Sequence, residues 1–454
     1  MASSKKLLPS DLPALVEAKL KDWVQPGRHL TLALSGGVDS VVLLDILVPL
    51  GTSLNFHLSA LYVNHQISPN AARWAEFCAG LCAARGVSFA AVKVDIARQP
   101  GESLEALART ARYRAFAEQK TDFVVLAQHL DDQAETLLLQ LLRGAGAKGL
   151  SAMAVRREGA AMVAPHYVRP LLDVPRQTIL DYAKAHSLEW VEDESNADIA
   201  FDRNYLRHQV MPLLERRFPG YRQTFARTSR NLADCAQLMN DLAQMDCAAA
   251  EVGGRLRIDT LASLTAPRSR NLLRFWLSGQ GTPIPSAGRL ENMMQQLCSS
   301  RDDAQVRIHL GDAIIRRYRG EIYVEQNTHA LRQELCLPWA LQEAMDLPGL
   351  GGRLCFEYAF GRGLSQAKLV AEPVTVRLRQ GGEQLRPDCR RPSRSLKNLL
   401  QEAGVPPWQR QRLPLLFSGE NLVFVPGIGA DCKYQAGEGE PGVVIKFEEL
   451  RLQP

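Results

Sequence analysis

A short glycine-containing stretch, Ser35-Gly36-Gly37-Val38-Asp39-Ser40, constrains the fold most strongly. It lies between an apolar run typical of a buried strand, residues 29–34, and a run typical of a helix, residues 41–47. A strand, a glycine turn and a helix N-terminus together gather backbone N–H donors, and the helix dipole adds partial positive charge. Glycines allow the backbone to approach a ligand closely and to take positive φ. The stretch therefore predicts a phosphate cradle in which Asp39 can hold a hydrated Mg²⁺.

This cradle differs from the Walker A loop, because no lysine follows its glycines. The alternative interpretation is a polar turn with Ser35 as the N-cap of the next helix, which the serine alone would support. Six matching residues in a strand-to-helix context favour phosphate binding. The pattern resembles the PP-loop of ATP pyrophosphatases, which cut ATP between the α- and β-phosphates and leave an adenylated intermediate. The resemblance implies ATP as a substrate but names no second substrate.

Predicted strands and helices alternate through the first 142 residues. The strands span residues 29–34, 56–63, 88–94 and 123–127, and the helices span residues 10–24, 39–50, 70–85, 103–119 and 131–142. This order predicts an α/β fold with a doubly wound parallel sheet. Ligands bind such sheets beyond the carboxyl ends of the strands. We therefore expect His65 and His129, which follow the second and fourth strands, to join residues 35–40 at the ATP site.

A second polar motif, His129-Leu130-Asp131-Asp132-Gln133-Ala134-Glu135-Thr136, opens the helix after the fourth strand. Asp131 and Glu135 are four residues apart and share a helix face. A well-capped helix is the alternative interpretation, because the dipole favours carboxylates at this end. Capping rarely combines three acids, a histidine and a glutamine. The motif therefore predicts carboxylates that hold Mg²⁺ beside ATP or take a proton from a nucleophile.

Cationic side chains recur at several places. Arg112 has no evident acidic partner within a helical turn, so we expect it to clamp a phosphate or carboxylate. Arg143 and Lys148 belong to a glycine-rich loop that could close over a substrate. Seven arginines between residues 203 and 230, with interleaved aromatics, suggest an RNA-facing stripe, although solvated helix faces also carry charge runs. The strongest basic cluster spans residues 386–412. The predicted tRNA-binding residues are Arg143, Lys148, Arg203, Arg207, Arg390, Arg391, Arg394, Lys397 and Arg410.

Composition adds few constraints. The formal net charge of +5 is too weak by itself to indicate nucleic-acid binding. Nine scattered cysteines form no CxxC pair and no zinc-ligand spacing, which predicts free buried thiols in a reducing compartment. No run approaches 18 apolar residues. We therefore expect a cytoplasmic protein that does not span a membrane.

The chain divides into three predicted domains. Residues 1–216 form the ATP-binding catalytic domain, residues 217–335 a mostly helical tRNA-contacting domain, and residues 345–454 an α+β C-terminal tRNA-binding domain. Short alternating apolar positions from 306 to 324 predict strands in the middle domain. The segment from 326 to 368 has only a weak pattern.

Taken in order, SGGVDS, HLDDQAET, LLRGAGAKGL, RPLL, EDESN, RNYLR and RSLKNLLQEAGVPPWQRQRLPLLF resemble the tRNA(Ile)-lysidine synthetase family. The resemblance implies that ATP adenylates O2 of the wobble cytidine in an isoleucine tRNA with a CAU anticodon. The ε-amine of free lysine then attacks C2, giving lysidine and AMP. It further implies that Asp132, with Asp131 and Glu135, binds the lysine ammonium and takes its proton. Many relatives carry a second histidine where this chain has Leu130, so a role for that position does not carry over.

Two alternatives remain open from the sequence. A PP-loop tRNA sulfur transferase would share the adenylation step but needs a catalytic cysteine or a cluster-binding set of residues near the site. A non-catalytic, nucleotide-dependent RNA-binding protein would not need Asp131, Asp132 and Glu135 together. The oligomeric state, including a homodimer, is not determined by the sequence.

Overall fold

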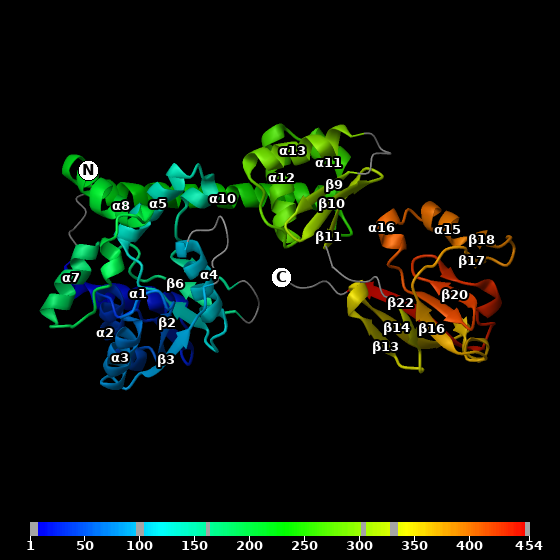
Figure 1. The fold of residues 1–454 in the computed structure, drawn as a ribbon, viewed down its shortest axis with the longest axis horizontal. Helices are drawn as coiled ribbons and strands as arrows, with labels where there is room; N and C mark the ends of the chain where they lie inside the picture. Colours follow the sequence, from blue (N-terminus) through cyan, green and yellow to red (C-terminus); the bar gives the residue numbers. More distant parts are fainter. Residues whose placement is uncertain (1–7, 97–103, 160–163, 301–305, 327–334, 450–454) are drawn as a thin grey trace. The chain divides into compact units, whose positions relative to one another are not determined.

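The computed structural model describes residues 8–96, 104–159, 164–300, 306–326 and 335–449 (Figure 1). The chain forms two compact units, Met1–Met239 and Asn240–Pro454, and each is described by itself. The boundary between them falls inside one long helix, α10 (Tyr221–Ala250). The predicted boundaries at residues 216, 335 and 345 stay a prediction.

A six-stranded sheet in the order β3-β2-β1-β4-β6-β5 forms the centre of the first unit. Its strands are β1 (His29–Ala33), β2 (His57–Asn64), β3 (Ser88–Lys93), β4 (Phe123–Val125), β5 (Arg156–Arg157) and β6 (His166–Val168). All neighbours pair in parallel except β5, which runs antiparallel to β6. The predicted α/β class is confirmed. The sequence did not predict β5 and β6, because β5 consists of two arginines and β6 is followed directly by Arg169, whereas the three-residue β4 lies in a run of five apolar residues.

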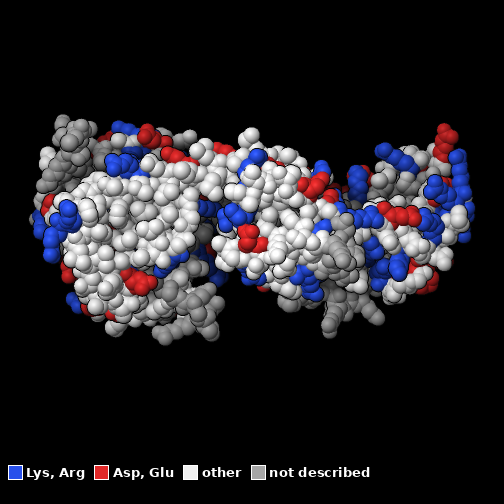
Figure 2. Space-filling view, turned by 90° about the horizontal axis from the view of Figure 1, so that it is seen from above, with Lys and Arg blue, Asp and Glu red and all other residues white. Residues whose placement is uncertain are grey.

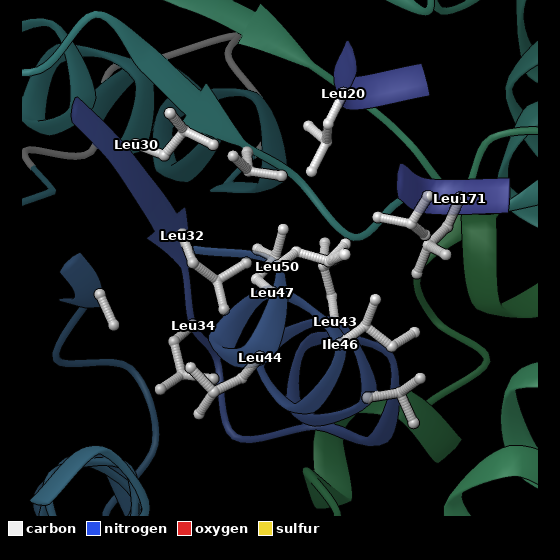
Figure 3. Packing of buried hydrophobic residues seen from close by; sticks show 14 of the residues in the cluster. Leu20, Leu30, Leu32, Leu34, Leu43, Leu44, Ile46, Leu47, Leu50 and Leu171 are labelled. Carbon is white, nitrogen blue, oxygen red and sulfur yellow. The ribbon is translucent and has the colours of Figure 1, made fainter. Parts of the chain in front are cut away.

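The main helices of this unit are α1 (Leu12–Trp23), α2 (Val38–Ser53), α3 (Ala71–Ala83), α4 (Leu104–Ala117), α5 (Leu130–Leu142) and α7 (Arg176–Ala185). Figure 3 shows Leu30, Leu32 and Leu34, on β1 and just beyond it, packed beside leucines of α2. Because α2 is apolar on nearly every side, it is buried along most of its length. Each fully buried leucine contributes about 1.5–3 kcal/mol, so this core fixes the end of β1 and the start of α2.

A smaller apolar cluster joins α5 to the segment beyond residue 210. Met211 and Tyr221 pack with Ala134 of α5. The intervening elements are the short helix α8 (Asp202–Tyr205), a π-helical turn over Leu206–Val210 and α9 (Met211–Arg217). This packing holds the segment with the arginine-rich motif against the acidic helix.

The second unit begins with helices packed on an antiparallel sheet of order β7-β8-β11-β10-β9. The helices are α11 (Ile258–Ser263), α12 (Ala266–Gly279) and α13 (Ala287–Ser299). The strands are β7 (Glu251–Val252), β8 (Arg255–Arg257), β9 (Arg307–Leu310), β10 (Ala313–Tyr318) and β11 (Glu321–Gln326). The structure thus contains the strands that alternation predicted between residues 306 and 324.

The C-terminal part of this unit is built mainly from antiparallel strands, as its predicted α+β class requires. One sheet has the order β12-β16-β19-β20-β21 and another the order β13-β14-β22-β15. Their strands are β12 (Cys336–Pro338), β13 (Ala344–Leu347), β14 (Gly352–Phe360), β15 (Leu364–Ser365), β16 (Val374–Arg377), β19 (Leu415–Ser418), β20 (Asn421–Val425), β21 (Gly429–Ala430) and β22 (Pro441–Glu449). A two-stranded sheet of β17 (Gln384–Leu385) and β18 (Arg394–Ser395) precedes α15 (Leu396–Glu402) and α16 (Pro407–Arg410).

The prediction that all cysteines are free is wrong for one pair. Cys389 and Cys432 form a disulfide across 43 residues of sequence. Pairing over that distance depends on how two loops meet, which cysteine spacing does not reveal. The free cysteines are Cys78, Cys82, Cys235, Cys247, Cys298, Cys336 and Cys355.

Within the described ranges, no helix has both the length and the apolar character that crossing a membrane requires.

Candidate active site

The predicted phosphate cradle forms the turn between β1 and α2. Gly36 has a φ of +84°, in the left-handed region, and Gly37 is the extended N-cap of α2. A Cβ on Gly36 would lie 2.8 Å from Cγ2 of Val191 and 3.2 Å from Sγ of Cys78. Both the backbone angle and the close packing therefore require glycine at this position. The first N–H groups of a helix lack acceptors within the helix, so those at the start of α2 can donate to an anion.

The two serines of the cradle have different surroundings. Ser40 is buried, and its hydroxyl donates to the Gly37 carbonyl oxygen at 2.9 Å. It also accepts from the backbone N–H of Ser35 at 3.2 Å. Ser40 therefore stabilises the turn from its buried side, whereas Ser35 is exposed and can contact a ligand.

His129 connects the cradle to the acidic motif. It is the N-cap of α5, and its backbone N–H donates to Oδ2 of Asp132 at 3.1 Å. Its Nε2 lies 3.6 Å from Oδ2 of Asp39 and 3.4 Å from Oδ2 of Asp132. The cradle and the acidic helix, which are 90 residues apart in sequence, thus meet at one buried imidazole, because β1 and β4 are neighbours in the sheet.

The charge of His129 follows from its surroundings. Burial lowers the pKa of the imidazole, but Asp132 and Asp39 outweigh this effect and raise the pKa to about 9. A charged imidazolium donates from both nitrogens and cannot accept a hydrogen bond. The backbone N–H of Asp132, whose nitrogen lies 3.4 Å from Nδ1, can therefore donate to the ring only when the ring is neutral. The surroundings favour the charged form of His129, because carboxylate oxygens of Asp39, Asp131 and Asp132 all lie within 4 Å of its ring nitrogens.

Two arginines from the segment after α7 contact the acidic motif. Arg203 donates from Nε to Oε2 of Glu135 at 2.8 Å and from a terminal nitrogen to Oδ1 of Asp132 at 3.2 Å. Arg207 donates from Nε to Oε1 of Glu135 at 2.7 Å and reaches the same Asp132 oxygen at 3.2 Å. Glu135 is only 2% exposed. Although burial alone would raise the pKa of Asp132, His129 and the two arginines lower it, so Asp132 is a carboxylate at neutral pH.

The third acid of the motif has a separate set of partners. Asp131 accepts from Nε of Arg222 at 2.5 Å and from the backbone N–H of Arg176 at 2.9 Å. Arg222 also forms a bidentate pair with Glu215. Asp131 therefore ties α5 to α7 and to the start of α10.

His65 and Arg112 form a pair of their own. Nε of Arg112 donates to Nε2 of His65 at 3.2 Å, which places the ring hydrogen on Nδ1. Burial, followed by the charge of Arg112, lowers the pKa of His65 to about 4, so the ring is neutral. Nδ1 is buried and has no hydrogen-bond partner among the described residues, so it can donate to a bound ligand.

Three family models match successive parts of this chain. A PP-loop domain model matches residues 12–214, the TilS substrate binding domain matches residues 256–323, and the TilS substrate C-terminal domain matches residues 374–447. A tRNA(Ile)-lysidine synthase of Nitrosomonas europaea is 43% identical over 452 residues, covering 100% of this chain and 99% of the relative. The chain belongs to the tRNA(Ile)-lysidine synthase family. Another family member, from Azoarcus sp., is 42% identical over 427 residues, covering 93% of this chain and 92% of the relative.

The lysidine synthase family consists of ATP-dependent ligases. The cysteines near the cradle do not have the properties that the alternative, a sulfur transferase, would require. Cys78 and Cys82 are fully buried in α3. Burial raises the pKa of Cys78 to about 12 and that of Cys82 to about 11. A sulfur transferase needs a thiolate at neutral pH, which neither residue supplies.

The other basic residues predicted from the sequence have varied surroundings. Arg143 caps α5 and lies 3.8 Å from Asp202, and Lys148 is exposed on the short helix α6 (Ala147–Leu150). In the C-terminal part, Arg394 pairs with Glu402, and Arg410 donates to the Val405 carbonyl oxygen. Arg390, Arg391 and Lys397 are exposed. Figure 2 shows lysines and arginines gathered over the C-terminal part of the chain.

Two arginines beside the acidic motif were not predicted from the sequence as site residues. The sequence pattern placed Arg222 only in a basic stripe, but in the structure its side chain binds Asp131. Arg169, buried within the RPLL motif, donates to the side chain of Gln128, to the Ala154 carbonyl and to the Tyr113 hydroxyl. An arginine in an apolar context such as RPLL is itself a signal, because a buried guanidinium needs partners.

Proposed function

We propose that the protein ligates lysine to C2 of the wobble cytidine of isoleucine tRNA with a CAU anticodon, in two steps at one site. In the first step, O2 of the cytidine attacks the α-phosphorus of ATP and pyrophosphate leaves. In the second step, the deprotonated ε-amine of lysine attacks C2, the C–O bond to the adenylate breaks, and AMP leaves. The contact of His129 with both Asp39 and Asp132 carries this proposal, since it brings the phosphate cradle and the acidic motif together.

The first step uses the cradle. Backbone N–H groups at the start of α2 and the exposed hydroxyl of Ser35 would hold the departing pyrophosphate. The free Nδ1 hydrogen of His65 offers a donor to ATP, and Arg112, oriented by His65, offers a cation to a phosphate. Val38 and His129 would contribute to the same pocket through the backbone and the ring.

Asp39 fits a Mg²⁺ ligand. In the part of the chain that the structure describes, its buried Oδ1 has no hydrogen-bond partner, which is costly unless a cation or water satisfies it. Within the described residues, no group of three or more His, Cys, Asp or Glu side chains forms a metal cage. One carboxylate combined with phosphate oxygens and water suits Mg²⁺, which would neutralise charge on the phosphates.

The second step uses the acidic motif. We assign Asp132 and Glu135 to the lysine ammonium, with Asp132 or a neighbouring carboxylate taking its proton, because a cationic amine is not a nucleophile. Both acids already accept hydrogen bonds from Arg203 and Arg207. An incoming ammonium must therefore share these oxygens or displace a guanidinium. Arg207 lies in a π-helical turn, a type of segment that often marks functional sites and can shift.

Contacts to tRNA are assigned to exposed cations. Arg143 and Lys148 lie beyond the end of the acidic helix, where they could cover a bound anticodon nucleotide. Arg390, Arg391 and Lys397 would grip tRNA phosphates farther from the anticodon, while Arg394 and Arg410 support that region from within. A cytoplasmic location stays a prediction, and the oligomeric state stays open.

The test is incorporation of labelled lysine into unmodified isoleucine tRNA carrying cytidine at the wobble position. We expect incorporation only with both ATP and cytidine, and none when uridine replaces the cytidine. ATP-dependent release of AMP with a sulfur donor, and no lysine incorporation, would overturn the assignment.

A further inference from the structure

The Cys389–Cys432 disulfide lies within the strongest basic cluster of the chain. The two Cα atoms are 5.4 Å apart, and the bond joins the loop after β17 to the 3₁₀ turn Cys432–Tyr434. Cys389 directly precedes Arg390 and Arg391. The redox state of this pair therefore bears on the position of the two exposed arginines.

Arg386 and Asp431 provide several of the hydrogen bonds of this loop, and Asp388 accepts one more from the backbone N–H of Arg390. The Arg386 carbonyl accepts from the backbone N–H of Cys432 at 2.7 Å, and the Arg386 N–H donates to Oδ2 of Asp431 at 2.9 Å. Nε of Arg386 donates to the Arg391 carbonyl at 2.6 Å. Arg386 thus points inward and shapes the loop, which leaves Arg390 and Arg391 exposed. These hydrogen bonds remain possible without the disulfide, so the loop would loosen rather than unfold.

The pair is accessible to redox partners. Cys389 is exposed, and Cys432 is half-buried. Exposed disulfides are the ones that are readily reduced and re-formed, and disulfides in reducing compartments are usually transient. Two other exposed cysteines, Cys235 and Cys336, remain unpaired, so exposure alone does not explain the pairing.

We propose that Cys389 and Cys432 form a reversible thiol–disulfide site that controls how Arg390 and Arg391 are presented to tRNA. This inference rests on the proposed function, in which the basic cluster grips tRNA. On oxidation, the two thiols give up two protons and two electrons and form the S–S bond, and a low-molecular-weight disulfide such as oxidised glutathione is reduced to two thiols. With the disulfide formed, the loop restricts the positions of Arg390 and Arg391 before tRNA binds. Less conformational entropy is therefore lost on binding.

The experiment measures the tRNA dissociation constant of the full-length protein after treatment with oxidised glutathione or with dithiothreitol. Thiol trapping with mass spectrometry reports whether Cys389 and Cys432 are joined. We expect the oxidised protein to bind tRNA about five- to ten-fold more tightly, the gain expected from fixing one or two long side chains. Cys389→Ser and Cys432→Ser should bind like the reduced protein under both treatments. Cys336→Ser, which removes an exposed free thiol, should respond like the wild type.

A double variant separates the redox proposal from the proposed tRNA grip. Arg390→Ser combined with Arg391→Ser should weaken tRNA binding in either redox state. If it does, but oxidised and reduced wild type bind equally, the redox proposal is overturned and the tRNA grip stands. If the double variant binds tRNA normally, the grip itself is wrong and the redox proposal falls with it. Failure of oxidised glutathione to join the two cysteines also overturns the redox proposal.

Discussion

Arg207 and Glu135 form a two-point ion pair in which Nε and a terminal nitrogen of the arginine donate to the two carboxylate oxygens at 2.7 and 2.9 Å. Arg203 contacts the same carboxylate from the preceding turn. The acids assigned to lysine binding are therefore not open in this structure. They are held by guanidinium groups, which occupy the oxygens that an ammonium would use.

Replacement of Arg207 should destabilise the protein. Arg207→Gln leaves the buried Glu135 carboxylate with one cation instead of two, and we expect a loss of about 2–3 kcal/mol in the free energy of unfolding, below the usual cost of an unpaired buried charge because Arg203 remains. Denaturant unfolding measures this loss. Arg176→Gln is the matched control, since only the backbone of Arg176 contacts the motif. Equal stability of wild type and Arg207→Gln would contradict the account.

Gly36 should not tolerate a side chain, whereas Gly37 should. Gly36→Ala combines a left-handed backbone, which costs about 1–2 kcal/mol, with a clash against Val191. Gly37 has ordinary extended angles, and a Cβ there would meet nothing closer than 3.6 Å. Thermal unfolding and ATP binding should both be impaired in Gly36→Ala and much less affected in Gly37→Ala. Similar behaviour of the two variants would refute this description of the cradle.

His65 should contribute to the pH dependence of stability. Its folded pKa of about 4 lies below the ordinary value of 6.5, so between these values the unfolded chain binds more protons than the native protein. Stability should therefore fall as the pH drops from 6.5 toward 4. In His65→Gln, which keeps a hydrogen-bond acceptor for Arg112 but does not titrate, this fall should be shallower. Parallel curves of melting temperature against pH for the two proteins would show that His65 does not titrate in this way.

Lys397 should contact a tRNA phosphate. Lys397→Gln should weaken tRNA binding and lower the slope of log affinity against log salt by about 0.7–0.9, the value for one lost phosphate contact. ATP binding should not change. Lys446→Gln removes an exposed lysine that pairs with Glu357 in the same part of the chain, and its salt slope should match the wild type. A normal slope for Lys397→Gln would remove this residue from the proposed grip.

Most of the catalytic sheet could be predicted because its signals are local. The run from His29 to Leu34 followed by two glycines specifies a strand, a turn and a helix without reference to the rest of the chain. The meeting of Asp39 with His129 also followed from the rule that ligands bind at the carboxyl ends of parallel strands.

The sequence did not reveal contacts that depend on long-range packing. The sequence pattern indicated an exposed basic stripe that includes Arg203, Arg207 and Arg222, because their spacing fits a helix surface. In the structure they point to Asp131, Asp132 and Glu135, about 70–90 residues earlier in the chain. The Cys389–Cys432 pair was missed for the same reason, since two loops bring it together.

The central claim is that the cradle and the acidic motif perform successive steps at one site. Asp132→Asn tests it directly when two quantities are followed in the same folded variant: pyrophosphate release with tRNA and ATP but no lysine, and transfer of labelled lysine. The account predicts pyrophosphate release close to that of the wild type and a loss of lysine transfer of at least about 100-fold, as expected when a proton acceptor is removed. Unchanged lysine transfer, or an equal loss of both activities, would contradict it.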